Sequence, residues 1–181
     1  MIAKILKRGA FGLFNGYYRR QFNRFCIAAG KCKLFIIDID NTIADTMQWE
    51  REHPGKRIKV AELLPLLSMK QWLEEETAGG KIVYLSARNY WQKGKTKQWL
   101  QQHGFMREDE LLVLVPSAKD KIAYLEEAVK RKTEVVYVDD LSYLRPNGQQ
   151  GFYEDLIRQV KKLPLTYLDY QFISSRSTSH A

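Results

Sequence analysis

Short apolar runs alternate along the chain with segments whose apolar residues are spaced for helices. The runs at 34–37, 82–85, 111–115 and 135–138 are continuous, as expected of parallel strands covered on both faces. Helical spacing predicts helices at 61–76, 92–103, 119–131 and 152–162. This alternation predicts an α/β fold, a three-layer α/β/α sandwich around a central parallel sheet.

The segments outside this alternation complete the predicted domain organisation. Residues 1–33 have helix-like apolar spacing with Lys and Arg between, although three glycines weaken the helix prediction. We therefore expect a basic amphipathic segment at 1–33, a single domain at 34–173 and a disordered tail at 174–181. Residues 43–60 are polar and irregular, which predicts a small flap.

The formal net charge of +8 belongs to the first segment alone. Eight of the 29 basic residues lie in 1–33, and the other 21 balance the 21 acidic residues, all of which follow residue 33. A basic, aromatic-rich helix can pack on the domain with its charges in water, lie on an anionic membrane surface, or contact nucleic acid. The sequence leaves these three interpretations open and indicates no protein partner.

Compartment follows from the cysteines and from the apolar runs. The two cysteines, Cys26 and Cys32, do not form a secreted disulfide framework, which favours a reducing compartment. No apolar run approaches the roughly 18 residues that span a bilayer. We expect a cytoplasmic protein, peripheral on the membrane's inner face if residues 1–33 bind anionic lipid.

Polar side chains that can catalyse a reaction or bind a metal follow the first, second and fourth predicted strands. A basic helix start also precedes the fourth strand. The candidates are Asp38, Asp40, Thr42, Ser86, Arg88, Lys119 or Lys121, Asp139 and Asp140. The carboxyl ends of parallel strands share one edge of a sheet, so these groups should converge there. Four acidic groups in a small cleft repel one another unless a cation lies among them, and hard oxygen ligands suit Mg²⁺.

These elements resemble the haloacid dehalogenase superfamily of phosphatases. That family carries an apolar strand followed by D-x-D-x-T, then a strand ending in Ser or Thr, a later Lys, and a strand ending in an acidic pair. All four elements occur here in that order across about 34–145. The resemblance implies a Rossmannoid fold, a Mg²⁺ cofactor and phosphatase activity, and the short intervals between the motifs leave no room for a large cap domain.

The resemblance also implies roles for the residues that match. Asp38 would attack phosphorus to form an aspartyl-phosphate, and Asp40 would serve as general acid and then as general base. Ser86 would hydrogen-bond the phosphoryl group, and the lysine would neutralise its charge.

The remaining matched residues would hold the metal and the first loop. Asp139 would bind Mg²⁺ with Asp38 and with Asp40 through its carbonyl, while Asp140 would ligate or orient the ion. Thr42 would support the loop and contact substrate, and Asn41, where many members have Gly, tolerates a left-handed backbone.

The sequence leaves the identity of the lysine open. Apolar residues fall three and four places after Lys121, as at the family's usual helix start, and this spacing favours Lys121. Lys119 is the alternative, as the catalytic lysine or as a substrate-binding residue.

A finer resemblance concerns the substrate. Residues 85–88, Thr96, 99–100 and 103–105 are similar to the phosphatase domain of polynucleotide kinase-type repair enzymes, which implies that Ala87 and Arg88 bind substrate. The chain lacks a kinase phosphate loop, and the neutral balance of 34–181 weakens a nucleic-acid substrate. An oligonucleotide 3′-phosphate end and a small phosphorylated metabolite both remain candidates. The alternative class is a non-catalytic phosphate-binding or scaffold module tethered to a membrane surface by residues 1–33. The intact acid set argues against it, because such a module could have lost Asp38 or Asp40.

Overall fold

The computed structural model describes residues 2–131 and 134–177, with side chains described from residue 15 to residue 176 across the same gap. Its centre is a five-stranded parallel sheet in the order β3-β2-β1-β4-β7. The strands are β1 (Leu34–Ile37), β2 (Lys81–Ser86), β3 (Leu111–Leu114), β4 (Val135–Val138) and β7 (Thr166–Leu168). Every residue of β1 and β4 is buried, which confirms the interpretation of their continuous apolar runs.

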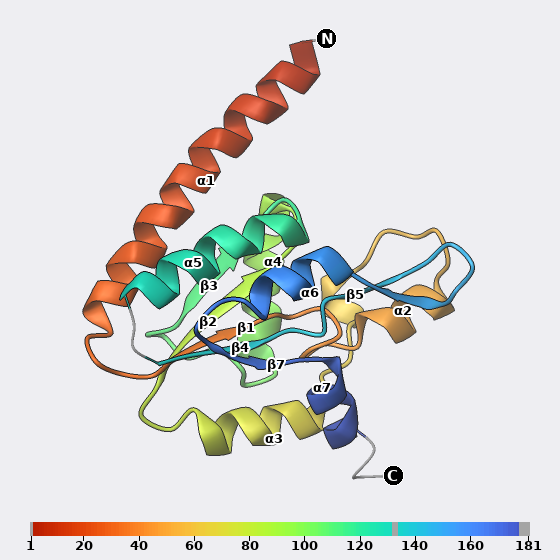
Figure 1. Cartoon of the computed structure of the whole chain (residues 1–181). Helices are drawn as coiled ribbons and strands as arrows, with labels where there is room; N and C mark the ends of the chain where they lie inside the picture. Colours follow the sequence, from red (N-terminus) through yellow and green to blue (C-terminus); the bar gives the residue numbers. More distant parts are fainter. Residues whose placement is uncertain (1, 132–133, 178–181) are drawn as a thin grey trace.

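Helices cover both faces of the sheet and confirm the three-layer sandwich (Figure 1). One face carries α1 (Ile2–Ala28), α5 (Ile122–Arg131) and α6 (Glu154–Val160). The opposite face carries α3 (Leu67–Glu76) and α7 (Tyr170–Ser177), while α4 (Lys93–Gln102) packs beside β3. Trp72 joins two of these elements to the sheet, with its ring 6.5 Å from Phe35 and 5.2 Å from Phe172.

The first helix is continuous through its glycines, and its second half belongs to the domain. Tyr18, Phe22 and Cys26 are buried, and the Phe22 ring lies 5.2 Å from Tyr124 of α5. The Tyr124 hydroxyl also donates to Asn15 Oδ1 at 3.2 Å. The first half projects away from the sheet (Figure 1). Among residues 2–131 and 134–177, no helix is long and apolar enough to cross a membrane.

The helix expected at 61–76 begins later, at Leu67. Leu66 has an extended backbone because the preceding residues pair with the loop after β1: Leu66 N donates to Ile43 O, and Asp45 N donates to Leu64 O, both at 2.9 Å. Only a 3-10 turn, η1 (Val60–Glu62), forms ahead of it. This pairing holds the loop beside the carboxyl end of β1.

Several regular elements, among them strand β7, were not expected from the sequence. Helix α2 (Thr46–Glu52) lies within the predicted flap, capped by Asp45, which accepts from Gln48 N at 3.0 Å. The antiparallel hairpin β5 (Ser142–Leu144) and β6 (Gln150–Phe152) follows β4. Residues 174–177 of the expected disordered tail belong to α7, and 178–181 lie outside the described residues.

Candidate active site

Three carboxylates meet where the two central strands end side by side. Asp38 follows β1, and Asp139 and Asp140 follow β4; the two strands are joined there by the Asp38 amide, which donates to Val138 O at 2.9 Å. One oxygen from each carboxylate lies within 4.8 Å of the others. All three residues are at most 4% exposed, so their charges face little water.

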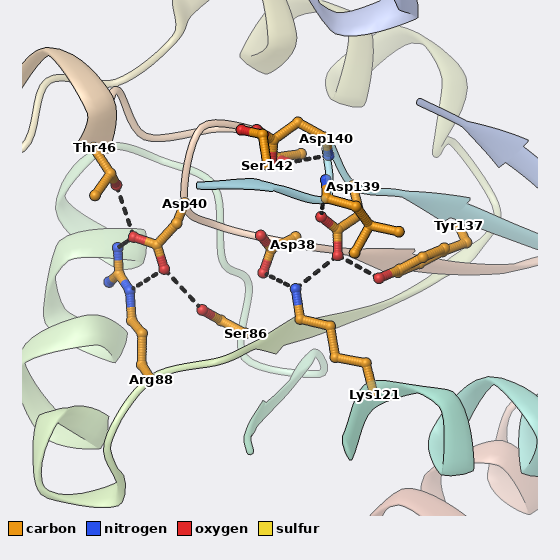
Figure 2. A network of polar contacts seen from close by, with 12 residues as sticks. Asp38, Asp40, Thr46, Ser86, Arg88, Lys121, Tyr137, Asp139, Asp140 and Ser142 are labelled. Atoms are coloured by element: carbon orange, nitrogen blue, oxygen red, sulfur yellow. Dashed lines mark hydrogen bonds and ion pairs between the residues drawn. The ribbon is translucent and has the colours of Figure 1, made fainter. Parts of the chain in front are cut away.

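Lys121 provides the positive charge of this cluster. It ends the 3-10 turn η3 (Ala118–Lys121) ahead of α5, and its Nζ lies 2.8 Å from Asp38 Oδ1 and 2.6 Å from Asp139 Oδ2 (Figure 2). Lys119 lines a separate cavity beside α6 instead. The structure therefore places Lys121, rather than Lys119, against the predicted nucleophile.

The cluster carries excess negative charge. Burial and then the neighbouring Asp139 raise the pKa of Asp38 well above the usual carboxyl value. Burial and Asp139 also raise the pKa of Asp140 to about 7. Burial lowers the pKa of Lys121, but Asp139 and Asp38 outweigh it and raise that pKa, so the ammonium stays charged. Three carboxylates with one ammonium leave a formal charge suited to a divalent cation.

Asp139 is held by groups that sequence reasoning missed. The Tyr137 hydroxyl donates to Asp139 Oδ2, and the amide of Leu141 donates to Asp139 Oδ1 at 2.8 Å (Figure 2). The Tyr167 hydroxyl donates to the Asp139 carbonyl at 3.0 Å, and the two tyrosine rings stack at 5.6 Å. These contacts fix the carboxylate that faces Lys121.

Asp40 lies beside the cluster but is occupied by other partners. Arg88 donates to both of its oxygens, from Nε at 2.9 Å and from Nη2 at 2.7 Å. Thr46 donates to Oδ1 at 2.7 Å and Ser86 to Oδ2 at 3.1 Å (Figure 2). Burial raises the pKa of Asp40, but Arg88 and the hydroxyl donors outweigh it and lower that pKa to about 2. Asp40 is therefore a carboxylate in this arrangement.

A cavity of about 250 Å³ opens onto these groups. Its lining includes Asp38, Asp40, Ala87, Lys121, Asp139 and Asp140. Besides Lys119, three residues expected to bind substrate do not line it within the described part of the chain: Thr42, Ser86 and Arg88, all of them buried. Ser86 and Arg88 are engaged by Asp40 instead, and Thr42 Oγ1 accepts from the Asp140 amide at 3.4 Å. Thr42 thus ties the first loop to β4, in line with its expected support of that loop.

Part of the cavity lining comes from elements absent from the predicted fold. Glu50 of α2 and Tyr143 of the β5–β6 hairpin line it, together with Tyr153 at the start of α6. The Tyr143 and Tyr153 rings are 4.9 Å apart. The dipeptide Asn147-Gly148 is a hairpin signal that could have revealed the β5–β6 hairpin.

Asn41 explains how the first loop turns back beneath the site. Its φ of 55° is left-handed, as the sequence suggested for a position where Gly is common. Its side chain also accepts from the Met47 amide at 2.7 Å, which orients the start of α2. The same residue therefore turns the chain and positions the helix that carries Thr46.

A magnesium ion fits the donor set. Asp38, Asp139 and Asp140 offer hard oxygens, and the raised pKa values of Asp38 and Asp140 mark negative charge that the protein alone leaves unbalanced. The side chain of Asp40 faces Arg88 instead, so Asp40 would bind the ion through its backbone carbonyl oxygen, as expected from the resemblance.

Comparison with known proteins supplies a family. No curated protein and no solved structure matches the chain. The family model described as PITM 1-3, LNS2 domain matches residues 35–140, more than half of the chain. That interval contains every residue of the acidic cluster together with Asp40, Ser86, Arg88 and Lys121. The chain therefore belongs to the PITM 1-3, LNS2 domain family.

Proposed function

We propose that this chain is a magnesium-dependent phosphomonoester hydrolase of the haloacid dehalogenase type, with Asp38 as its nucleophile. The observation that carries the proposal is the position of Lys121, whose Nζ joins Asp38 to Asp139 in a buried site beside Asp140. A buried carboxylate without a compensating charge is costly, and Asp140 adds such a carboxylate to the Lys121 pairings. Membership of the LNS2 family supports a phosphatase-related domain.

The first step forms a covalent intermediate. A carboxylate oxygen of Asp38 attacks phosphorus, the new Asp38–phosphorus bond forms, and the bond from phosphorus to the ester oxygen breaks. Lys121 stabilises the charge on the nucleophile and on the transferring phosphoryl group. Asp38, Asp139 and Asp140 would hold a Mg²⁺ ion, whose positive charge would stabilise the transition state.

Asp40 handles the protons of both steps. Its protonated carboxyl donates to the leaving alkoxide, and the resulting carboxylate then takes a proton from water. The water oxygen attacks phosphorus, the Asp38–phosphorus bond breaks, and inorganic phosphate leaves. The low pKa of Asp40 while Arg88 binds it means that Arg88 must change partners first. An incoming phosphate supplies that partner, because a guanidinium binds phosphate and carboxylate alike.

The same engagement of Asp40 favours a second candidate, a non-catalytic phosphate-binding module. With Arg88, Ser86 and Thr46 all on its carboxylate, Asp40 is not free to transfer protons in the conformation described. If Arg88 keeps this partner when phosphate arrives, the domain would bind phosphate without hydrolysing it.

Hydrolysis of a generic aryl phosphate separates the two candidates. We expect phosphate release with Mg²⁺, loss of release when the metal is chelated, and loss in Asp38→Asn. The folded state of each protein is checked by circular dichroism. Folded wild-type protein that releases no phosphate at micromolar concentration, yet binds inorganic phosphate with Mg²⁺, would establish the binding module instead.

A further inference from the structure

A second groove adjoins the acidic cavity. It has a volume of about 740 Å³ and lies between residues 56–62 and the segment formed by η2 (Tyr90–Gln92) and α4. Ile58 lines both the groove and the acidic cavity, so the two hollows are neighbours that share this residue. A ligand bound in the groove therefore lies next to the cavity that contains Asp38.

The groove is basic. Its lining includes four cationic side chains, Lys56, Arg57, Lys59 and Lys95. Glu62 is the single acid among the described residues of its lining, and it already binds Lys59 Nζ at 2.8 Å and accepts from Trp49 Nε1 at 3.2 Å. The remaining positive charge faces the groove, where it attracts a polyanion.

This charge is invisible in the balance of the whole domain. Residues 34–181 are formally neutral, yet neither 53–61 nor 77–107 contains an Asp or Glu. The acids lie elsewhere, for example at residues 74–76 and 108–110. The neutral balance therefore does not count against a nucleic-acid ligand, because the two charges are separated on the surface.

An exposed indole completes the groove. Trp91 lines it and is 73% exposed, three residues after the Arg88 that binds Asp40. Aromatic side chains along a basic groove are the usual means of binding single-stranded nucleic acid, because every base can stack on them. The amides of Gln98 and Gln102 add donors and acceptors for base edges, whereas Gln92 Oε1 already accepts from the Asn89 amide at 3.2 Å.

We propose that this groove binds single-stranded nucleic acid, whose terminal phosphate enters the acidic cavity. The claim about the terminal phosphate rests on the proposed phosphatase function, whereas binding in the groove does not. The concave shape, the amides and the single exposed indole favour a strand over a lipid surface, which is met by a projecting apolar face.

Binding is measured with the full chain carrying Asp38→Asn, so that the terminal phosphate persists. The ligands are two fluorescent oligodeoxythymidylates, one with a 3′-phosphate and one with a 5′-phosphate. We expect Trp91→Ala to raise Kd about tenfold and Trp91→Phe to keep near-wild-type affinity, since Phe also stacks. Because Lys59 is paired with Glu62, three cationic contacts remain. They predict a slope of log K against log salt of about −2, falling to about −0.7 in the Lys56→Ala/Lys95→Ala variant.

The matched control is the Lys130→Ala/Lys161→Ala variant, which removes two exposed lysines outside the groove and should keep the wild-type slope. Vesicles of phosphatidylcholine with and without phosphatidic acid test the lipid alternative. Unchanged oligonucleotide binding in both groove variants would overturn the proposal. It would also be overturned if those variants lost vesicle binding while oligonucleotide binding stayed the same.

Hydrolysis of aryl phosphate by the wild-type chain is measured separately. If the wild-type chain does not hydrolyse aryl phosphate but binds oligonucleotide in the groove, the enzymatic role is refuted and the binding proposal stands. Full activity without groove-dependent oligonucleotide binding would remove the groove and leave the enzyme.

Discussion

Arg88 binds both carboxylate oxygens of Asp40, through Nε at 2.9 Å and Nη2 at 2.7 Å. The guanidinium is 5% exposed and the carboxylate 25% exposed, so the pair is largely shielded from water. Bidentate geometry of this kind is also how a guanidinium binds phosphate. In the described conformation Asp40 occupies the side chain that a phosphoryl group would otherwise use.

Replacing Arg88 separates its two roles. We expect Arg88→Gln to raise KM for aryl phosphate about tenfold to a hundredfold, because a charged hydrogen bond to phosphate is lost. The pKa of Asp40 should rise at the same time, since Arg88 no longer offsets its burial. Steady-state kinetics across a range of pH checks both effects. An unchanged KM would show that Arg88 never leaves Asp40.

Lys121 should matter to stability as well as to turnover. Lys121→Met leaves Asp38 and Asp139 buried without their shared cation, which costs about 3–5 kcal/mol in the free energy of unfolding. Turnover should fall at least a hundredfold. Urea unfolding and aryl phosphate hydrolysis measure the two effects. Exposed Lys130→Ala is the control and should change neither, whereas a stable and active Lys121→Met would contradict the assigned role.

Tyr137 should act through Asp139 on metal binding. Tyr137→Phe removes the hydroxyl that donates to Asp139 and keeps the ring that stacks on Tyr167. We expect Mg²⁺ affinity to fall about tenfold, the usual effect of losing a partner of a ligating carboxylate. Isothermal titration with Mg²⁺ gives the affinity. Equal Mg²⁺ affinity in the variant and the wild type would show that the amide of Leu141 suffices to orient Asp139.

Mg²⁺ affinity should depend on pH through Asp140. Burial and Asp139 raise the pKa of Asp140 to about 7, so protons compete with the cation below that value. Affinity should increase as pH rises from about 5 to about 8 and level off above it. The stability of the metal-free protein should change with pH in the opposite direction. The folded state retains a proton that the unfolded state has lost, so stability falls as pH rises from about 4 to about 7.

Thermal unfolding with and without Mg²⁺ across this range tests both trends. The shift in Tm produced by the metal should be largest at the alkaline end. Asp140→Asn should flatten both curves, and the exposed Asp155→Asn should leave them as in the wild type. A metal effect that is the same at every pH would contradict the involvement of Asp140.

The centre of the sheet and the positions of the acidic residues could be predicted from the sequence. Strands β1 and β4 are uninterrupted apolar runs, a local signal that survives without knowledge of neighbours. Strand β7 has only three residues, none fully buried, so its pattern does not differ from that of a loop. Hairpin β5–β6 is equally short, and its turn dipeptide was its one local mark.

The site was harder to predict where it depends on contacts between distant segments. Tyr137 sits in a strand of apolar residues and looked like core, and its hydroxyl has meaning only beside Asp139. Arg88 lies 48 residues from Asp40, and spacing alone cannot show that the two side chains bind each other. The lysine was different, because helix phase separates Lys121 from Lys119 and the structure places only the former against Asp38.

The anchored half of α1 sets a direction for its other half. Phe22 and Tyr18 are fixed against the domain, and the helix continues without a break to Ile2. At 1.5 Å per residue, the stretch from residue 2 to residue 14 reaches about 20 Å along one line. Any charged surface that bound this stretch would therefore also determine the tilt of the sheet. The opening of the cavity at Asp38 would then be held at a fixed angle to that surface.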